Sequence, residues 1–323
     1  MQSAQIGATG VHVSEIGFGS AGIGNLYRSG SDDDAEAAIE ASWQAGIRYF
    51  DTAPHYGLGL AETRLGRALA GRPRADFVLS TKVGRLLVPN PRPTGTDLAE
   101  GGFDVPDEMT RLRDYSRDGV LRSLEASLDR LGTDHVDIAL VHDPDDHVSP
   151  TVREALPTLV ALRDQGVIGA VGIGMNQWQV PLQVLAHTDL DVVMLASRWT
   201  LIDRSGQPLM QECARRGVSV LAAAPYNSGL LATDWPDDDE RYDYRSAPVE
   251  LVHGCRDLAR TAQEHGSSLP DLALQFPLRH PATAGVVVSL RTAEEVDAAL
   301  RRSSATIPTD LWVEIDKKGL VNV

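Results

Sequence analysis

Four polar residues stand where apolar segments of the sequence end or just beyond. Asp51, Lys82 and His142 close the segments 48–51, 77–82 and 136–142, and Tyr56 follows Asp51 after a short loop. Polar side chains at the ends of buried strands are costly to bury unless they are paired. If these strand ends converge on one opening, the four side chains meet there. The alternative is a buried ion pair between Asp51 and Lys82 without a catalytic role.

Together these residue types can move a proton to or from an oxygen atom. A phenol has an ordinary pKa of about 10 and is a weak base at neutral pH. A neighbouring Lys82 ammonium favours the phenolate of Tyr56, and Asp51 keeps that ammonium charged and oriented. Tyr56 then exchanges a proton with an oxygen that becomes, or ceases to be, a carbonyl. His142 can donate a hydrogen bond to the same oxygen and fix the substrate.

The elements that must position these residues alternate along the chain. Short apolar runs rich in β-branched residues predict buried parallel strands at 15–18, 48–51, 77–82, 136–142, 170–174, 192–196, 218–222 and 285–288. Segments with helical periodicity lie between them, at 33–45, 62–70, 120–131, 151–165, 177–186, 208–216, 249–265 and 292–301. Eight such pairs predict an α/β fold, a single-domain (β/α)8 TIM barrel over residues 1–323.

Two long loops follow predicted strands on the face where barrel enzymes hold their sites. Residues 84–119 follow the third strand and residues 224–248 the seventh, and loops of this length without regular structure are often lids. The acidic run 237–240 is either part of such a lid or a solvated loop tip. The tail predicts an extra C-terminal helix, 310–318, that packs Leu311, Trp312 and Ile315.

Composition excludes several classes of protein. The 30 Lys and Arg against 45 Asp and Glu give a formal net charge of −15, which disfavours nucleic-acid and anionic-membrane partners. No apolar run reaches the length of a membrane helix, and the N-terminus lacks the pattern of a signal peptide. Cys213 and Cys255 are far apart and are expected to be buried packing residues in a reducing compartment. We therefore expect a cytoplasmic protein, and its oligomeric state is open.

Two motifs point to other functions and are rejected. Residues 17–22 match G-x-G-x-x-G, but a dinucleotide fingerprint needs a helix directly after it, and the next helical pattern begins about ten residues later. The run 142–147 contains His142, Asp143 and His147, but Pro144 prevents a shared helical face and no third His or Cys is near. We expect no metal site.

The stretch Asp51-Thr52-Ala53-x-x-Tyr56-Gly57, with Lys82 and His142 after successive strands, resembles the aldo-keto reductase superfamily. The resemblance runs from about Gly7 to about Leu300. It implies a (β/α)8 barrel that moves hydride between a nicotinamide cofactor and a carbonyl or alcohol. It also implies a catalytic tetrad, which falls here on Asp51, Tyr56, Lys82 and His142.

A finer resemblance, to the aldose dehydrogenase branch, lies in the segments 114–116, 120–132, 141–145, 174–177 and 224–231. Members of that branch oxidise a ring hemiacetal carbon to a lactone. The resemblance therefore implies an aldose substrate such as L-fucose, D-arabinose or L-galactose. Pyridoxal or a general aldehyde on the same machinery is the alternative substrate class. A regulatory subunit that binds cofactor is the non-enzyme alternative.

The resemblance also implies which residues hold the cofactor. Asn176 matches the residue that binds the nicotinamide carboxamide, whereas Met175, Ala196 and Ala223 depart from the family's usual residues nearby. The expected cofactor-binding residues are Gly19, Ser20, Asp51, Asn176, Ser197, Ser228, Gly229, Leu230, Ser289, Arg291 and Glu295. The expected substrate-binding residues are Tyr56, His142, Trp199 and Tyr226, of which the last two can supply a ring face or belong to the core.

The residues expected at the adenosine end favour NAD, with NADP as the alternative. NADP-preferring relatives carry Lys and Arg at the positions of Ser289 and Glu295. A carboxylate repels a phosphate and can accept a hydrogen bond from a free ribose hydroxyl. Arg291 argues the other way, because it can meet a phosphate or stack on adenine.

Overall fold

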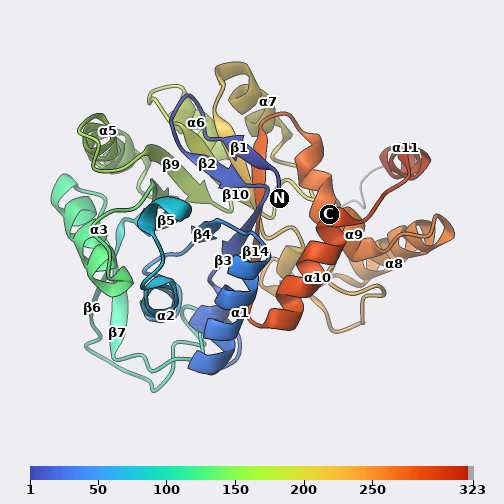
Figure 1. Ribbon diagram of the computed structural model, residues 1–323, viewed down its shortest axis with the longest axis horizontal. Coiled ribbons are helices and arrows are strands. Elements are labelled where there is room, and N and C mark those ends of the chain that lie inside the picture. The colour runs from blue at the N-terminus through green and yellow to red at the C-terminus, as the bar shows by residue number, and fades with distance from the viewer. Residues whose placement is uncertain (319–323) are drawn as a thin grey trace.

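Eight parallel strands form a closed barrel in the order β10-β11-β14-β3-β4-β5-β8-β9 (Figure 1). The computed structural model describes residues 1–318. The strands are β3 (Ile16–Gly19), β4 (Tyr49–Asp51), β5 (Val78–Val83), β8 (Ile138–His142), β9 (Ala170–Met175), β10 (Val192–Ala196), β11 (Ser219–Ala223) and β14 (Thr283–Ser289). Each predicted strand is present within two residues at either end. The predicted (β/α)8 barrel is confirmed.

Alternation along each strand divides the apolar residues between two cores. In β8, Ile138 and Leu140 face the barrel interior, where Tyr49 and Val192 also pack. Ala139 and Val141 face outward and pack with the helices in the larger core. A hairpin of β1 (Ser3–Gln5) and β2 (His12–Ser14) adds residues to the inner cluster. Both faces of the barrel wall are therefore buried, which explains the continuous apolar runs in the sequence.

The predicted helices surround the barrel. They are α1 (Asp32–Gln44), α2 (Leu60–Leu69), α3 (Arg117–Leu131), α5 (Leu156–Asp164), α6 (Gln179–Leu185), α7 (Gln207–Arg216), α8 (Val249–Glu264) and α10 (Ala293–Ser304). The side chains of Ser31, Ser116 and Thr292 accept backbone N–H groups at the starts of α1, α3 and α10. Helices α1 and α10, from opposite ends of the chain, pack side by side (Figure 1).

The structure changes the start of one predicted helix, adds one helix and confirms the C-terminal helix. The helix predicted at 151–165 starts earlier, as the short α4 (Val148–Pro150) and a π-helical turn over Thr151–Ala155. Helix α9 (Leu269–Gln275) was not predicted, although Ser268 and Asp271 form a capping box at its start. The predicted C-terminal helix is α11 (Thr309–Lys318), with Leu311 and Ile315 buried and Trp312 packed against the core at partial exposure.

The expectation of two loops without regular structure is wrong. The first contains the antiparallel pair β6 (Arg85–Pro89) and β7 (Met109–Arg113), and the second contains the hairpin β12 (Arg241–Tyr242) and β13 (Arg245–Ser246). At the tip of this hairpin Asp243 and Tyr244 have φ angles of 50° and 66°. Positive φ at both turn residues matches the twist of a two-residue hairpin, but Asp-Tyr lacks the usual glycine signal. The aspartates of the acidic run 237–240 are exposed, as in a solvated loop tip.

The glycine motif at residues 17–22 is not followed directly by an α-helix. Gly17 and Gly19 belong to β3, and the following η1 (Gly22–Gly24) is a single 3₁₀ turn that ends before a loop leads to the start of α1 at Asp32. Cys213 and Cys255 are buried and free. Within residues 1–318, no group of three or more His, Cys, Asp or Glu could hold a metal ion. None of the helices in the same range is long and apolar enough to cross a membrane.

A buried polar cluster fastens β5 to its covering helices. The carboxylate of Glu62, on α2, is fully buried and accepts hydrogen bonds of 2.7 Å from Thr81 Oγ1 and Arg130 Nε. Thr81 lies on β5 directly before Lys82, and Arg130 lies on α3. The cluster therefore fixes the outer face of the strand whose inner face carries Lys82.

We expect Arg130→Met to lower the free energy of unfolding by about 3 kcal/mol, because it leaves the Glu62 carboxylate buried without its cation. Arg122→Met on the same helix is the matched control, since Arg122 is 60% exposed and pairs with the surface residue Asp114. That change should cost less than about 1 kcal/mol. Urea unfolding of both variants measures the difference. Equal losses would show that the buried cluster does not stabilise the wall.

Candidate active site

Three charged or phenolic groups meet at the carboxyl ends of β4 and β5. The ammonium of Lys82 donates hydrogen bonds to Asp51 Oδ2 at 2.7 Å, to the Thr52 carbonyl at 3.0 Å and to Tyr56 Oη at 3.1 Å. An ammonium has three protons, so all of them are used. Asp51 and Lys82 are each only 2% exposed, which makes this a buried ion pair with the phenol at its outer end.

The hydrogen-bonded chain continues into the barrel. Ser80 donates its single hydroxyl proton to Asp51 Oδ1 at 2.7 Å, and its oxygen lies 3.0 Å from the hydroxyl of Tyr49. Tyr49 must therefore be the donor in that contact. Its ring also fills the space beside Gly17, where a Cβ atom would clash with it. Both oxygens of Asp51 are thus held, and the carboxylate cannot turn away from Lys82.

Burial and charge set the protonation states of this chain. Burial lowers the pKa of Lys82, but the Asp51 carboxylate and Tyr56 outweigh it, and the net pKa is raised. Burial raises the pKa of Tyr56 to about 12, against the lowering effect of the Lys82 ammonium. The sequence argument considered only the ammonium, and burial is the larger effect. At neutral pH the site therefore holds a charged lysine and a protonated phenol.

His142 completes the group from the neighbouring strand. Its ring lies edge-on to the Tyr56 ring, with centroids 6.0 Å apart. The hydroxyl of Tyr115 donates to the His142 carbonyl at 2.7 Å and so holds the end of β8. Burial, together with the charges of Arg85 and Lys82, puts the pKa of His142 well below its ordinary value. The imidazole is therefore neutral at pH 7, and its buried Nδ1 has no hydrogen-bond partner among the described residues.

The sequence profile of the Aldo/keto reductase family matches residues 15–319, nearly the whole chain. The chain belongs to the aldo/keto reductase family. It is accordingly an oxidoreductase that uses NAD or NADP. The order of the strand ends and the meeting of Asp51, Lys82, Tyr56 and His142 agree with that membership.

Individual aldo/keto reductase relatives are similar over nearly their whole length. A D-threo-aldose 1-dehydrogenase from Pseudomonas sp is 40% identical over 318 residues, which cover 97% of this chain and 96% of the relative. A pyridoxal 4-dehydrogenase from Microbacterium luteolum is 34% identical over 335 residues, covering 98% and 97%. Among solved structures, the holo form of aldo-keto reductase AKR11C1 from Bacillus halodurans has a TM-score of 0.77 at 27% identity, covering 100% of this chain and 98% of that one.

The residues expected around the nicotinamide lie at the ends of β9, β10 and β11. Asn176 follows β9 and donates from Nδ2 to the hydroxyl of Tyr244 at 3.3 Å. Ser197 and Ser228 both have positive φ, and the Ser228 hydroxyl accepts the backbone N–H of Tyr244 at 3.2 Å. The side chain of Leu230 is fully buried in the core, so only its backbone is available to a ligand.

Gly19 and Ser20 lie at the end of β3, beside the end of β4. The backbone N–H of Ser20 donates to the Asp51 carbonyl, and the Ser20 hydroxyl is buried with no hydrogen-bond partner among the described residues. An orphaned buried hydroxyl next to the Asp51 main chain is a group that a bound cofactor could satisfy. Gly229 has a φ of 106°, which permits the turn after β11.

Of the three residues expected at the adenosine end, Arg291 lines a cavity of about 210 Å³, whereas Ser289 and Glu295 are not among its lining residues. Arg28 and Arg291 both line it, and Arg291 Nη2 donates to the Leu26 carbonyl at 3.1 Å. The Ser289 hydroxyl accepts the Gly22 N–H at 2.9 Å, and a Glu295 carboxylate oxygen accepts the Arg291 N–H at 2.8 Å. Guanidinium groups at a cavity suit a phosphate-bearing cofactor, so the residues present fit a nicotinamide dinucleotide.

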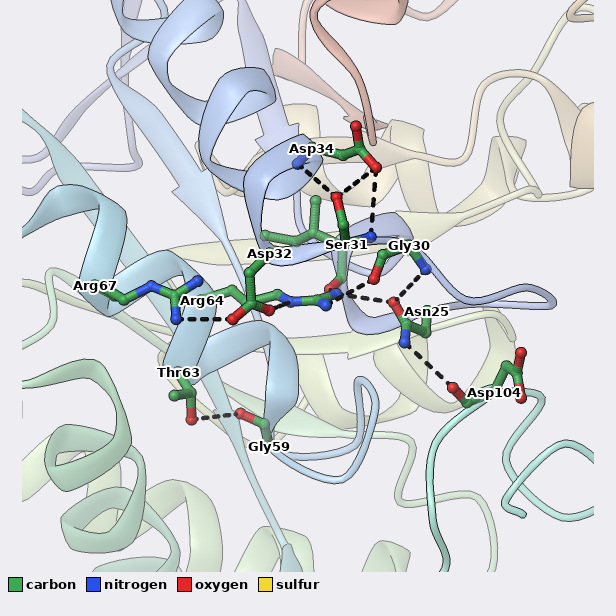
Figure 2. A network of polar contacts seen from close by, with 11 residues as sticks. Asn25, Gly30, Ser31, Asp32, Asp34, Gly59, Thr63, Arg64, Arg67 and Asp104 are labelled. Atoms are coloured by element: carbon green, nitrogen blue, oxygen red, sulfur yellow. Dashed lines mark hydrogen bonds and ion pairs between the residues drawn. The ribbon is translucent and has the colours of Figure 1, made fainter.

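Arg64, a buried arginine, is one of the residues that line this cavity, and its hydrogen bonds form the network drawn in Figure 2. Arg64 donates to Asn25 Oδ1 at 2.8 Å, to the Gly30 carbonyl at 2.8 Å and to Asp32 Oδ1 at 2.7 Å. Asn25 Oδ1 also accepts the Gly30 N–H, so the loop after β3 closes on itself around the guanidinium. This network joins that loop to the starts of α1 and α2.

Two of the residues expected at the substrate lie in packed surroundings instead. The Trp199 ring packs against Phe276 and His280 at centroid distances of 5.5 and 5.2 Å and is 8% exposed. The Tyr226 ring lies under Arg302, whose Nη1 lies 3.3 Å from the Tyr226 hydroxyl. The structure gives neither residue a hydrogen bond or ring contact to the tetrad, and their packing contacts are those of the core alternative.

Sequence reasoning did not single out Tyr244, His55 or Arg85 as site residues, and it considered Asp143 only as a possible metal ligand. His55 packs between Phe103 and His142, with ring centroids 5.2 and 5.7 Å apart. Asp143 stands at a strand end beside His142, so the signal that selected His142 applied to it as well. Tyr244 lies in a loop with no local signal, and only the fold brings it to Asn176.

Proposed function

We propose that the protein oxidises the anomeric carbon of an aldose, of the L-fucose, D-arabinose or L-galactose type, to a lactone with reduction of NAD. The observation that carries this proposal is the 3.1 Å contact between the Lys82 ammonium and the Tyr56 hydroxyl above a buried Asp51. The choice of an aldose rests on the 40% identity to a D-threo-aldose 1-dehydrogenase.

The tetrad performs the proton transfer in this reaction. The anomeric hydroxyl of the sugar binds between Tyr56 Oη and His142, and Tyr56, as phenolate, takes its proton. Lys82 stabilises that phenolate, and Asp51 balances the lysine charge. The neutral imidazole of His142 donates to the same oxygen and fixes the sugar ring. A nicotinamide dinucleotide held by these strand ends would supply the acceptor for the hydride of the anomeric carbon.

The cofactor would lie along the strand ends from Asn176 to Arg291, over Ser20, Ser197, Ser228 and Gly229. Asn176 would hold the carboxamide. Glu295 adds negative charge at the adenosine end, which favours NAD, while the guanidinium of Arg291 already bonds the Leu26 carbonyl. Pyridoxal is the second candidate substrate, because a pyridoxal 4-dehydrogenase is 34% identical along 98% of this chain.

A pH dependence follows from the raised pKa of Tyr56, about 12 in this buried position. Since the group is protonated far above neutral pH, oxidation requires a minor phenolate form whose population grows as pH rises. We expect kcat/KM for aldose oxidation to increase up to about pH 10, while carbonyl reduction, which uses the phenol, stays level. Steady-state rates in both directions measure this. An oxidation rate that levels off below about pH 8 would contradict the assignment.

The substrate and cofactor are tested by absorbance of reduced nicotinamide across a panel of aldoses and pyridoxal, each with NAD and with NADP. We expect L-fucose-type sugars with NAD to give the highest kcat/KM, by about tenfold over NADP, and a lactone as product. Turnover of pyridoxal alone would replace the substrate and keep the mechanism. Tight NAD binding without turnover of any panel member would favour a regulatory subunit, and a preference for NADP would contradict the reading of Glu295.

A further inference from the structure

A second carboxylate lies beside the tetrad, and the proposed mechanism does not use it. Asp143 follows His142 at the end of β8, and its side chain is 23% exposed. Asp143 Oδ2 lies 3.5 Å from His142 Nε2 and accepts a hydrogen bond from Arg85 Nη2. No described residue donates a hydrogen bond to the other oxygen, Oδ1, which is not fully buried. Asp143 thus presents a free acceptor at the mouth of the site.

The backbone holds this carboxylate in place. Asp143 has a φ of 39°, an unfavourable region for a residue with a side chain. Its N–H donates to the Gly174 carbonyl at 3.0 Å, and its carbonyl lies 2.9 Å from the Tyr115 hydroxyl, which shares its one proton between the His142 and Asp143 carbonyls. The main chain is therefore fastened on both sides of the side chain, and the carboxylate direction is fixed before any substrate arrives.

Arg85 supplies the matching donor. It begins β6, directly after the strand that carries Lys82, and is only 8% exposed. Its Nε is buried and has no hydrogen-bond partner among the described residues. Burial raises the pKa of Asp143, and Arg85 and Lys82 act against that rise. Arg85 therefore holds one carboxylate oxygen of Asp143 and leaves the other oxygen accessible at the mouth of the site.

We propose that Asp143 and Arg85 form a subsite that recognises the hydroxyl on the carbon next to the reacting carbon of the substrate. The inference rests on the proposed function, which puts the reacting oxygen against His142. Oxygens on neighbouring carbons lie about one hydrogen-bond length apart, so a vicinal hydroxyl reaches the carboxylate beside His142. The hydroxyl donates to Asp143. Aldoses with a free 2-hydroxyl are the substrates, and 2-deoxy sugars are rejected.

The expected discrimination is large, because a site built to bond a hydroxyl rejects an analogue that lacks it. We expect wild-type kcat/KM for the preferred aldose to exceed that for its 2-deoxy analogue by about 10- to 100-fold. In Asp143→Asn this ratio should fall to within a few-fold of one. Asp145→Asn, an exposed carboxylate in the same loop, is the matched control and should keep the wild-type ratio.

The ratio separates recognition from a role exerted through His142. If Asp143→Asn slows both sugars equally and keeps their ratio, Asp143 only positions the imidazole and the subsite is overturned. Equal kcat/KM for the two sugars in the wild-type enzyme overturns it too, whether or not the variant folds. If the wild-type enzyme oxidises no aldose, the proposed function is refuted and the subsite with it. This outcome differs from oxidation of both sugars at equal kcat/KM, which refutes the subsite alone.

Discussion

The buried contact of Lys82 with Asp51 and Tyr56 is the interaction on which the rest of the site depends. Removing two charges from water costs several kcal/mol per ion, and only close pairing with full hydrogen bonding offsets that cost. Here the ammonium uses all three protons, and Ser80 and Tyr49 hold the far side of the carboxylate. The barrel must therefore keep β4 and β5 in register, or leave a charge buried alone.

Strand β5 is also fixed from its outer face, by contacts with the covering helices. Lys82 faces inward from β5, while its neighbour Thr81 faces outward to Glu62 and, through it, to Arg130 on α3. The same strand thus carries a reactive lysine on one face and a buried anchor on the other. Alternation of side chains along a strand makes this division possible. Glu62 and Arg130 therefore link two covering helices to the strand that carries Lys82.

Much of this architecture could be predicted from the sequence, because its signals are local. Apolar runs marked the strands, helical periodicity marked the helices, and polar residues closing those runs marked the mouth. The meeting of Asp51, Lys82 and Tyr56 followed from barrel closure alone. Burial of Tyr56 reversed the expected direction of its pKa, because a local pattern does not measure desolvation.

What could not be predicted depends on contacts between distant segments. The pairing of β6 with β7 joins residues 20 to 28 positions apart, and the hairpin of β12 and β13 has no glycine at its turn. Tyr244 reaches Asn176 only because the hairpin of β12 and β13 folds over the end of β9. Trp199, in contrast, was expected to bind substrate because it follows a predicted strand. In the structure its ring packs against Phe276.

The most direct test of the account is the turnover and cofactor affinity of Tyr56→Phe beside the wild-type enzyme. The change removes one hydroxyl and leaves the ring, the Lys82–Asp51 pair and the cofactor residues in place. We predict that kcat falls by at least about a thousandfold, as expected for loss of an acid–base group, while the Kd for NAD changes little. Turnover close to the wild-type value would show that another group carries the proton.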